Sequence, residues 1–188
     1  MILKNIPNIL SVSRIFLAPV FFFLLVSDIL LYVWFSLVVF FLGSLTDAFD
    51  GYLARRYQLE SKFGKNIDPF SDKVFILVSF LSLMYVMPDY VRYWMILIIF
   101  IRDVFVTYLR KISEDKKLDF KTNYFAKRKT LIQVIVIHAI LLIYIFEKYY
   151  AFHINLNIIY YLMIIPVVVT FLSGISYWFQ YKRLIHEK

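Results

Sequence analysis

Four aspartates lie close together in the first half of the chain, at spacings that suit helices. They are Asp47, Asp50, Asp68 and Asp72. Residues three or four apart share one helical face, so each pair would present two carboxylates in one direction. Four carboxylates gathered without counter-charges would repel one another and raise one another's pKa values. The cluster therefore favours a cation-binding site over a set of solvated charges at the membrane surface.

The donor atoms of this cluster favour hard divalent cations. The chain has no cysteine, and carboxylate oxygens select Mg²⁺ or Mn²⁺ over Zn²⁺. Two such ions bridged by carboxylates bind a diphosphate and stabilise phosphoryl transfer. We therefore expect a two-metal site that handles a phosphorylated substrate.

Small residues and one arginine accompany the aspartates. Gly51 and Gly64 flank the cluster, and a residue without a side chain lets a ligand or a neighbouring backbone approach closely. Helix packing or a loop turn would explain either glycine equally well. Ala54 continues the small, acidic helical face that begins at Asp47. Arg55 offers phosphate a planar guanidinium group, and a role as a membrane-surface anchor is the alternative.

The elements that must position these residues are long apolar helices. The chain has 188 residues, 62% of them hydrophobic, whereas soluble domains are about half apolar. A helix needs about 20 mostly apolar residues to span a bilayer. Six segments are candidate spans: residues 7–27, 29–46, 74–88, 89–110, 130–146 and 154–181. The expected fold class is all-α, an integral membrane bundle of six transmembrane helices in one domain over residues 1–188.

The boundaries of the helices that carry the aspartates follow from polar residues. The second helix is expected over residues 30–57, and a polar loop over residues 58–67 joins it to the third helix. Asp68 is expected to cap the third helix, with Pro69 in its first turn. Ahead of the first helix, residues 5–8 are expected to form a short amphipathic segment at the membrane surface.

The net charge of +8 is unevenly distributed along the chain. With six spans, every lysine and arginine except Arg92 and Lys148 falls on the side of both termini and of the second and fourth loops. The positive-inside rule makes that side, and both termini, cytoplasmic. At ~1.5 Å per residue, Asp47 lies roughly 25 Å along its helix, near the cytoplasmic edge of the membrane. No basic patch belongs to a nucleic-acid-reading fold, so no nucleic-acid partner is expected.

A second group of charges lies in the fourth and fifth predicted helices. Arg102 and Asp103 fall inside the fourth span, where ionised side chains are costly and usually line a cavity or pair with one another. Arg110 lies about two turns further on, and Lys127 and Lys129 begin the fifth helix. The four basic residues would form a pocket for a phosphorylated substrate. A structural Arg102–Asp103 pair and two surface-anchoring lysines are the alternative.

The spacing of the aspartates resembles the signature of the CDP-alcohol phosphatidyltransferase family. The matching run is Asp47-x2-Asp50-Gly51-x2-Ala54-Arg55-x8-Gly64-x3-Asp68-x3-Asp72. The resemblance implies six transmembrane helices, commonly in a homodimer, with a polar cavity that opens to the cytosol at the cell membrane. It implies two metal ions held by the four aspartates and Asp72 as general base. It also implies a cytidine nucleotide beside Gly51, Ala54 and Gly64, with its diphosphate beside Arg55.

The resemblance also implies a reaction and an acceptor. A hydroxyl deprotonated by Asp72 would attack the lipid-linked phosphorus of CDP-diacylglycerol, and CMP would leave. The outer motifs are similar to those of bacterial phosphatidylglycerophosphate synthases, which use glycerol 3-phosphate. These motifs are Asn5-Ile6-Pro7-Asn8-Ile9-Leu10 with Ser13-Arg14, Leu109-Arg110, and Lys127-x-Lys129-Thr130-x2-Gln133. Arg102, Arg110, Lys127 and Lys129 would then bind the acceptor phosphate.

Two departures keep other acceptors open. That group often has Arg-Glu where this chain has Arg102-Asp103, and glycine where it has Ala126. Arg-Asp at this place is also similar to cardiolipin synthases, which use phosphatidylglycerol. Glycerol 3-phosphate is therefore the expected acceptor, with phosphatidylglycerol, inositol phosphate and serine as alternatives. An ion-coupled transporter is the alternative outside this family, although the chain lacks the inverted repeat typical of transporters.

Overall fold

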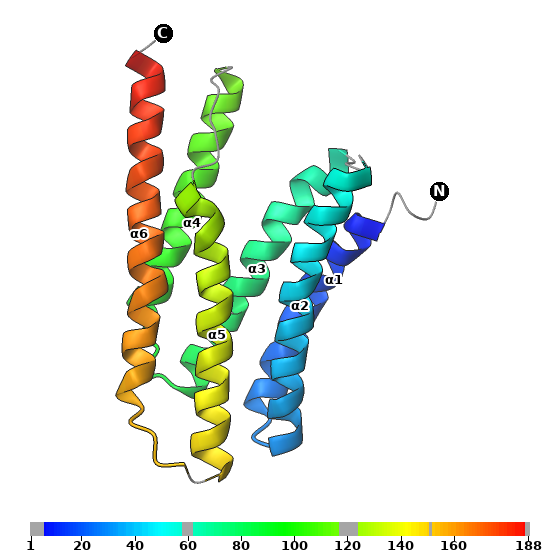
Figure 1. Ribbon diagram of the computed structural model, residues 1–188, viewed down its shortest axis with the longest axis vertical. Coiled ribbons are helices and arrows are strands. Elements are labelled where there is room, and N and C mark those ends of the chain that lie inside the picture. Colours follow the sequence, from blue (N-terminus) through cyan, green and yellow to red (C-terminus); the bar gives the residue numbers. More distant parts are fainter. Residues whose placement is uncertain (1–5, 58–61, 117–123, 151, 187–188) are drawn as a thin grey trace. The chain divides into compact units, whose positions relative to one another are not determined.

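The computed structural model describes the backbone of residues 6–57, 62–116, 124–150 and 152–186 (Figure 1). Within these ranges, the side chains of residues 6–8, 47–57, 62–69, 124–127 and 186 lie outside the description. The described residues form six helices and no strand, which confirms the all-α prediction. The helices are α1 (Ile6–Val26), α2 (Leu30–Tyr57), α3 (Lys62–Val86), α4 (Tyr93–Asp115), α5 (Tyr124–Tyr150) and α6 (Asn157–His186).

Three of the described helices are long and apolar enough to cross a membrane. Their candidate spans are Ile9–Val26, Arg128–Tyr150 and Asn157–Ile185, and a shorter apolar stretch runs over Leu30–Thr46. Large apolar side chains on these helices remain exposed, among them Phe16, Phe23 and Phe171. Exposed apolar surface on this scale is typical of contact with lipid, so the protein is a membrane protein. The number of six spans and the cytoplasmic termini stay predictions.

The start of α3 differs from the prediction. The helix begins at Lys62, so residues 62–67 are helical and the expected loop is shorter. Asp68 therefore lies inside the helix, and its predicted role as a helix cap is wrong. Pro69 also lies inside α3. An interior proline removes a backbone hydrogen bond, and membrane helices tolerate that loss. Helix α2 is described as far as Tyr57, the predicted end of the second helix. Residues 6–8, predicted to lie in a separate segment ahead of the first helix, belong to α1, which begins at Ile6.

The chain divides into two compact units. Unit 1 comprises Met1–Pro88 and Ile137–Ile154, and unit 2 comprises Asp89–Val136 and Asn155–Lys188. In unit 1, α1 packs against α2 and α3, and in unit 2, α4 packs against α6. Helix α5 contributes its first half to unit 2 and its second half to unit 1. The prediction of one domain over residues 1–188 stays a prediction.

An aromatic core joins the first three helices. The rings of Phe21 and Phe40 lie 5.6 Å apart between centroids, and those of Phe40 and Phe75 are stacked at 5.4 Å. A Cβ atom added at Gly43 in α2 would lie 2.4 Å from Cζ of Phe75 in α3. Gly43 therefore allows the ring of Phe75 to lie directly against the backbone of α2.

A smaller core joins α4 and α6 in unit 2. Val106, Leu109 and Tyr177 are buried together there. A Cβ atom at Gly174 would lie 3.0 Å from Cγ of Arg102, so this glycine gives the stem of the arginine its room. The two helices thus pack through a mixed apolar and basic interface.

Candidate active site

The helices place the four aspartates as the sequence predicts, two on α2 and two on α3. Asp47 and Asp50 lie in α2, and Asp68 and Asp72 lie in α3. Asp72 has a described side chain. The side chains of Arg102, Arg110 and Lys129 are also described, whereas those of the remaining predicted site residues lie outside the description. They are Asp47, Asp50, Asp68, Gly51, Ala54, Arg55, Gly64 and Lys127.

The contact between Gly43 and Phe75 fixes where α2 and α3 meet. The two helices run in opposite directions and contact each other (Figure 1). Asp47 lies about one turn beyond Gly43, and Asp72 lies about one turn before Phe75. In an antiparallel pair both positions therefore fall on the same side of the contact. The close approach at Gly43 brings together the two helix segments that carry the carboxylates.

Arg14 lies directly against the carboxylate of Asp72. Nη1 of Arg14, in α1, donates a hydrogen bond to Oδ1 of Asp72, and the two side chains form an ion pair. Nη2 of Arg14 also donates to Oγ of Ser11, one turn earlier, at 3.4 Å. The side chain of Arg14 is 1% exposed, whereas that of Asp72 is 29% exposed. Asp72 thus has a fixed cationic neighbour and remains accessible.

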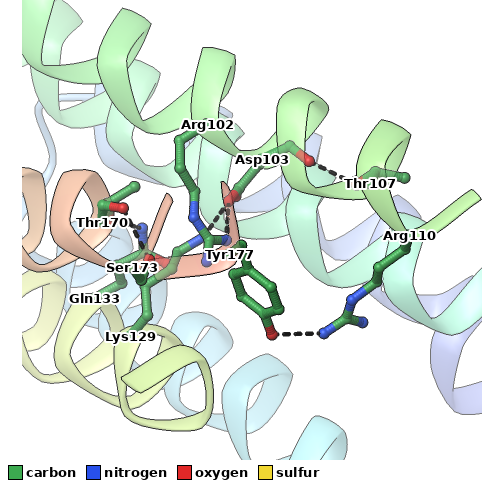
Figure 2. Close-up of polar contacts among 9 residues, drawn as sticks. All are labelled: Arg102, Asp103, Thr107, Arg110, Lys129, Gln133, Thr170, Ser173 and Tyr177. Carbon is green, nitrogen blue, oxygen red and sulfur yellow. Dashed lines mark hydrogen bonds and ion pairs between the residues drawn. The ribbon is translucent and has the colours of Figure 1, made fainter. Parts of the chain in front are cut away.

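A cluster of cations surrounds Asp103 in unit 2 (Figure 2). Oδ1 of Asp103 accepts a hydrogen bond from Nη1 of Arg102 at 3.0 Å and another from Nζ of Lys129 in α5. All three side chains are largely buried. The structure therefore brings Arg102 and Lys129 together at the carboxylate of Asp103. The Arg102–Asp103 ion pair is the one that the structural alternative predicts.

Tyr177 of α6 extends this cluster to Arg110. The guanidinium carbons of Arg102 and Arg110 lie 5.5 Å and 5.6 Å from the centroid of the Tyr177 ring. Nη2 of Arg110 also donates a hydrogen bond to the Tyr177 hydroxyl at 2.9 Å. The negative face of an aromatic ring attracts cations at this distance. The buried ring therefore lets two like charges lie near each other (Figure 2).

Two hydrogen-bond donors of Arg102 are buried without a partner among the described residues. These donors are its Nε and Nη2 atoms. Buried donors without a partner are costly and rare in native proteins. They lie beside three cations, Arg102, Arg110 and Lys129, and the carboxylate of Asp103. The formal charge of these four side chains is +2, which suits a bound anion.

Several residues of these clusters were not predicted as site residues from the sequence. Tyr177 falls in an apolar run, and no sequence feature links it to Arg110. Gln133 donates a hydrogen bond to Thr170 at 3.5 Å, on the face of α5 that carries Lys129. Arg14 and Gln133 had available signals. An arginine inside an apolar span usually has a functional or structural partner, and Gln133 belongs to the motif that begins at Lys127.

The donor set fits a divalent metal ion. Three of the four aspartates lie outside the described side chains, and the described residues hold no group of three potential ligands. The chemistry of the set still fits, because the four aspartates lie on two helices in contact and offer only hard oxygen ligands. The accessible Asp72 is the member of this set whose surroundings are described.

Comparisons with known proteins identify the family. Residues 4–172 match the CDP-alcohol phosphatidyltransferase family. A protein from Rickettsia typhi is 35% identical over 140 residues, which cover 74% of this chain and 78% of the relative. One from Cereibacter sphaeroides is 38% identical over 144 residues, covering 71% and 61%. One from Bacillus subtilis is 32% identical over 153 residues, covering 73% and 77%.

These three relatives carry the same name, CDP-diacylglycerol–glycerol-3-phosphate 3-phosphatidyltransferase. The match to the family covers most of the chain and includes both the aspartate signature and the Arg102–Lys129 region. Enzymes of this family generally depend on a divalent metal ion. The chain belongs to the CDP-alcohol phosphatidyltransferase family and is a transferase of phospholipid biosynthesis.

Proposed function

We propose that the protein transfers the phosphatidyl group of CDP-diacylglycerol to a hydroxyl of glycerol 3-phosphate, with release of CMP. The observation that carries the choice of acceptor is a pair of buried donors of Arg102, beside Lys129 and Tyr177, for which the described part of the chain offers no hydrogen-bond partner. Phosphate oxygens accept hydrogen bonds from a guanidinium fork in a fixed geometry. The names of the relatives give the same acceptor for those proteins.

Charge supports a phosphomonoester over the alternative acceptors. A phosphomonoester carries about −1.5 to −2 charges at neutral pH, close to the formal +2 of Arg102, Arg110, Lys129 and Asp103. Phosphatidylglycerol is a phosphodiester with one negative charge, and serine carries no net charge. Inositol phosphate is also a phosphomonoester, so the charge balance does not separate it from glycerol 3-phosphate.

Unit 1 supplies the groups for the CDP-lipid and for proton transfer. Asp47, Asp50, Asp68 and Asp72 would hold the metal ions, with Mg²⁺ or Mn²⁺ as the proposed ions. Gly51, Ala54, Arg55 and Gly64 would contact the nucleotide and its diphosphate, and Arg102, Arg110, Lys127 and Lys129 of unit 2 would hold the acceptor phosphate. When bound, the metal supplies positive charge against the negative charge that develops on the diphosphate.

Asp72 is the proposed general base. It would take the proton of the acceptor hydroxyl while the oxygen forms a new bond to the phosphorus that carries diacylglycerol. The bond from that phosphorus to the bridging oxygen breaks, and CMP leaves with the bonding electrons. Proton transfer to a positioned side chain typically accelerates such a reaction by a factor of about 10²–10⁴. The exposed fraction of Asp72 leaves its carboxylate open to a substrate.

The setting of the reaction is proposed from the sequence pattern and the family. Six spans would place both termini in the cytoplasm and the aspartates at the cytoplasmic edge of a cell membrane. A lipid-linked donor would then keep its acyl chains in the bilayer while the soluble acceptor arrives from water. A homodimer is proposed from the resemblance to the family.

The test is CMP release by the purified protein in detergent or liposomes containing CDP-diacylglycerol and Mg²⁺ or Mn²⁺. Glycerol 3-phosphate, phosphatidylglycerol, inositol 1-phosphate, inositol and serine are compared as acceptors, each with and without a chelator. Chelator-sensitive release with glycerol 3-phosphate alone is the expected result. Release with another acceptor would overturn the choice of acceptor, and no release from folded, metal-loaded protein would overturn the proposed activity.

A further inference from the structure

Arg14 is a charged side chain in an apolar helix that the proposed reaction leaves without a role. It lies within the candidate span Ile9–Val26 and is 1% exposed. An ionised side chain inside a membrane span is costly and marks a functional partner more often than a chance position. Its ion pair partner is Asp72, the proposed general base.

The geometry around Arg14 fixes the direction of its guanidinium group. Nη1 donates to Oδ1 of Asp72, and Nη2 donates to Oγ of Ser11, which is itself fully buried. Two donors of one planar group with partners on two helices leave the group little freedom to rotate. The carboxylate that it contacts is therefore held in one orientation relative to α3.

We infer that Arg14 is a positioning residue for the transfer reaction, which holds the carboxylate of Asp72 where it accepts the proton of the acceptor hydroxyl. This inference rests on the proposed function of Asp72. A base that is free to rotate spends only part of its time in reach of the hydroxyl, and small displacements of reacting groups are costly in rate. Loss of Arg14 should therefore lower kcat while leaving the binding of both substrates largely intact.

A purely structural role of the same contact predicts a different outcome. An ion pair between α1 and α3 would stabilise their packing, and its loss would lower the thermal stability of the protein. Phe21 offers a matched control because it is also buried on α1 and packs against Phe40 in the same unit. Phe21→Leu weakens the packing of α1 without any change at Asp72.

The experiment compares wild type, Arg14→Met, Arg14→Lys, Ser11→Ala and Phe21→Leu in detergent. The measurements are kcat, both KM values, the thermal unfolding midpoint and the Kd for CDP-diacylglycerol without acceptor. We expect Arg14→Met to lower kcat by about 100-fold, within the range of a general base, with KM values and Kd within about threefold of wild type. Arg14→Lys should recover part of kcat, because a lysine keeps the charge but not the fork.

Several results would overturn the inference. One is a kcat of Arg14→Met within threefold of wild type. Another is an equal loss of kcat in Phe21→Leu at the same unfolding midpoint, which would leave only a structural role. If Arg14→Met does not fold, Ser11→Ala and Arg14→Lys decide: both should lower kcat at unchanged Kd, and wild-type kcat in both would refute the positioning role. Inactive wild-type protein would instead refute the proposed function.

Discussion

The guanidinium group of Arg14 in α1 forms an ion pair with the carboxylate of Asp72 in α3. The two residues are separated by 58 positions in the sequence, and the close packing of α1 against α3 brings them together. The contact sets a buried cation beside the carboxylate to which the family resemblance gives the role of base. It therefore connects the fold of unit 1 with the chemistry proposed for it.

Replacement of Asp72 by asparagine tests the role of the base. An asparagine keeps the side-chain oxygen that accepts the hydrogen bond from Arg14, so the packing of α1 and α3 should persist. It cannot take a proton, so kcat should fall by about 10²–10⁴-fold. Binding of CDP-diacylglycerol should be partly retained. Turnover and equilibrium binding of CDP-diacylglycerol are the measurements. Near-normal turnover would show that another group accepts the proton.

Replacement of Lys129 by methionine tests the acceptor site. The side chain is largely buried and bonded to Asp103, and methionine keeps an apolar stem of similar length. The KM for glycerol 3-phosphate should rise by about 10- to 100-fold, because a hydrogen bond to a charged group contributes about 1.5–3 kcal/mol. The KM for CDP-diacylglycerol should change far less. Lys116, the exposed residue that directly follows α4, provides the control substitution Lys116→Met. In Lys129→Met, equal rises in the KM values for both substrates would contradict the assignment.

Replacement of Tyr177 by phenylalanine tests whether the Tyr177 hydroxyl positions Arg110 to bind the acceptor. In Tyr177→Phe the ring still lies near both arginines, but Arg110 loses the hydrogen bond of 2.9 Å. The KM for glycerol 3-phosphate should rise by about 2- to 10-fold, since such a bond contributes about 0.5–1.5 kcal/mol.

Tyr181→Phe is the matched control, one turn further along α6. Its hydroxyl accepts a hydrogen bond from Lys116 at 3.5 Å, outside the proposed acceptor cluster. We expect it to leave the KM for glycerol 3-phosphate unchanged. A similar rise in both variants would mean that the hydroxyl groups act on the packing of α6 as a whole.

Gly43 tests the contact that brings the carboxylate helices together. In Gly43→Ala the new methyl group would collide with the ring of Phe75, which is buried and stacked on Phe40. Such overpacking typically costs about 1–3 kcal/mol, so the unfolding midpoint and kcat should both fall. Adding Phe75→Leu should restore part of both, because the smaller side chain makes room for the methyl group. Strictly additive losses in the double variant would refute this explanation.

The sequence alone was enough for the all-helical fold class and for the family. Long uncharged runs predict the helices, since a membrane-spanning segment must satisfy its backbone within itself and be apolar along its length. The positions of Asp47, Asp50, Asp68 and Asp72 predict shared helical faces because helical periodicity is local. The predicted start of α3 was wrong because local capping preferences favoured a helix start at Asp68 over the longer helix that the structure contains.

The tertiary structure decided which distant residues become partners. Arg14 with Asp72, Lys129 with Asp103, and Arg110 with Tyr177 each join different helices, and no periodicity within one helix encodes such a pair. The same holds for Gly43, whose importance depends on a phenylalanine of another helix. Sequence spacing determines which face of a helix a residue occupies, whereas the partner of that face depends on how side chains of several helices pack together in three dimensions.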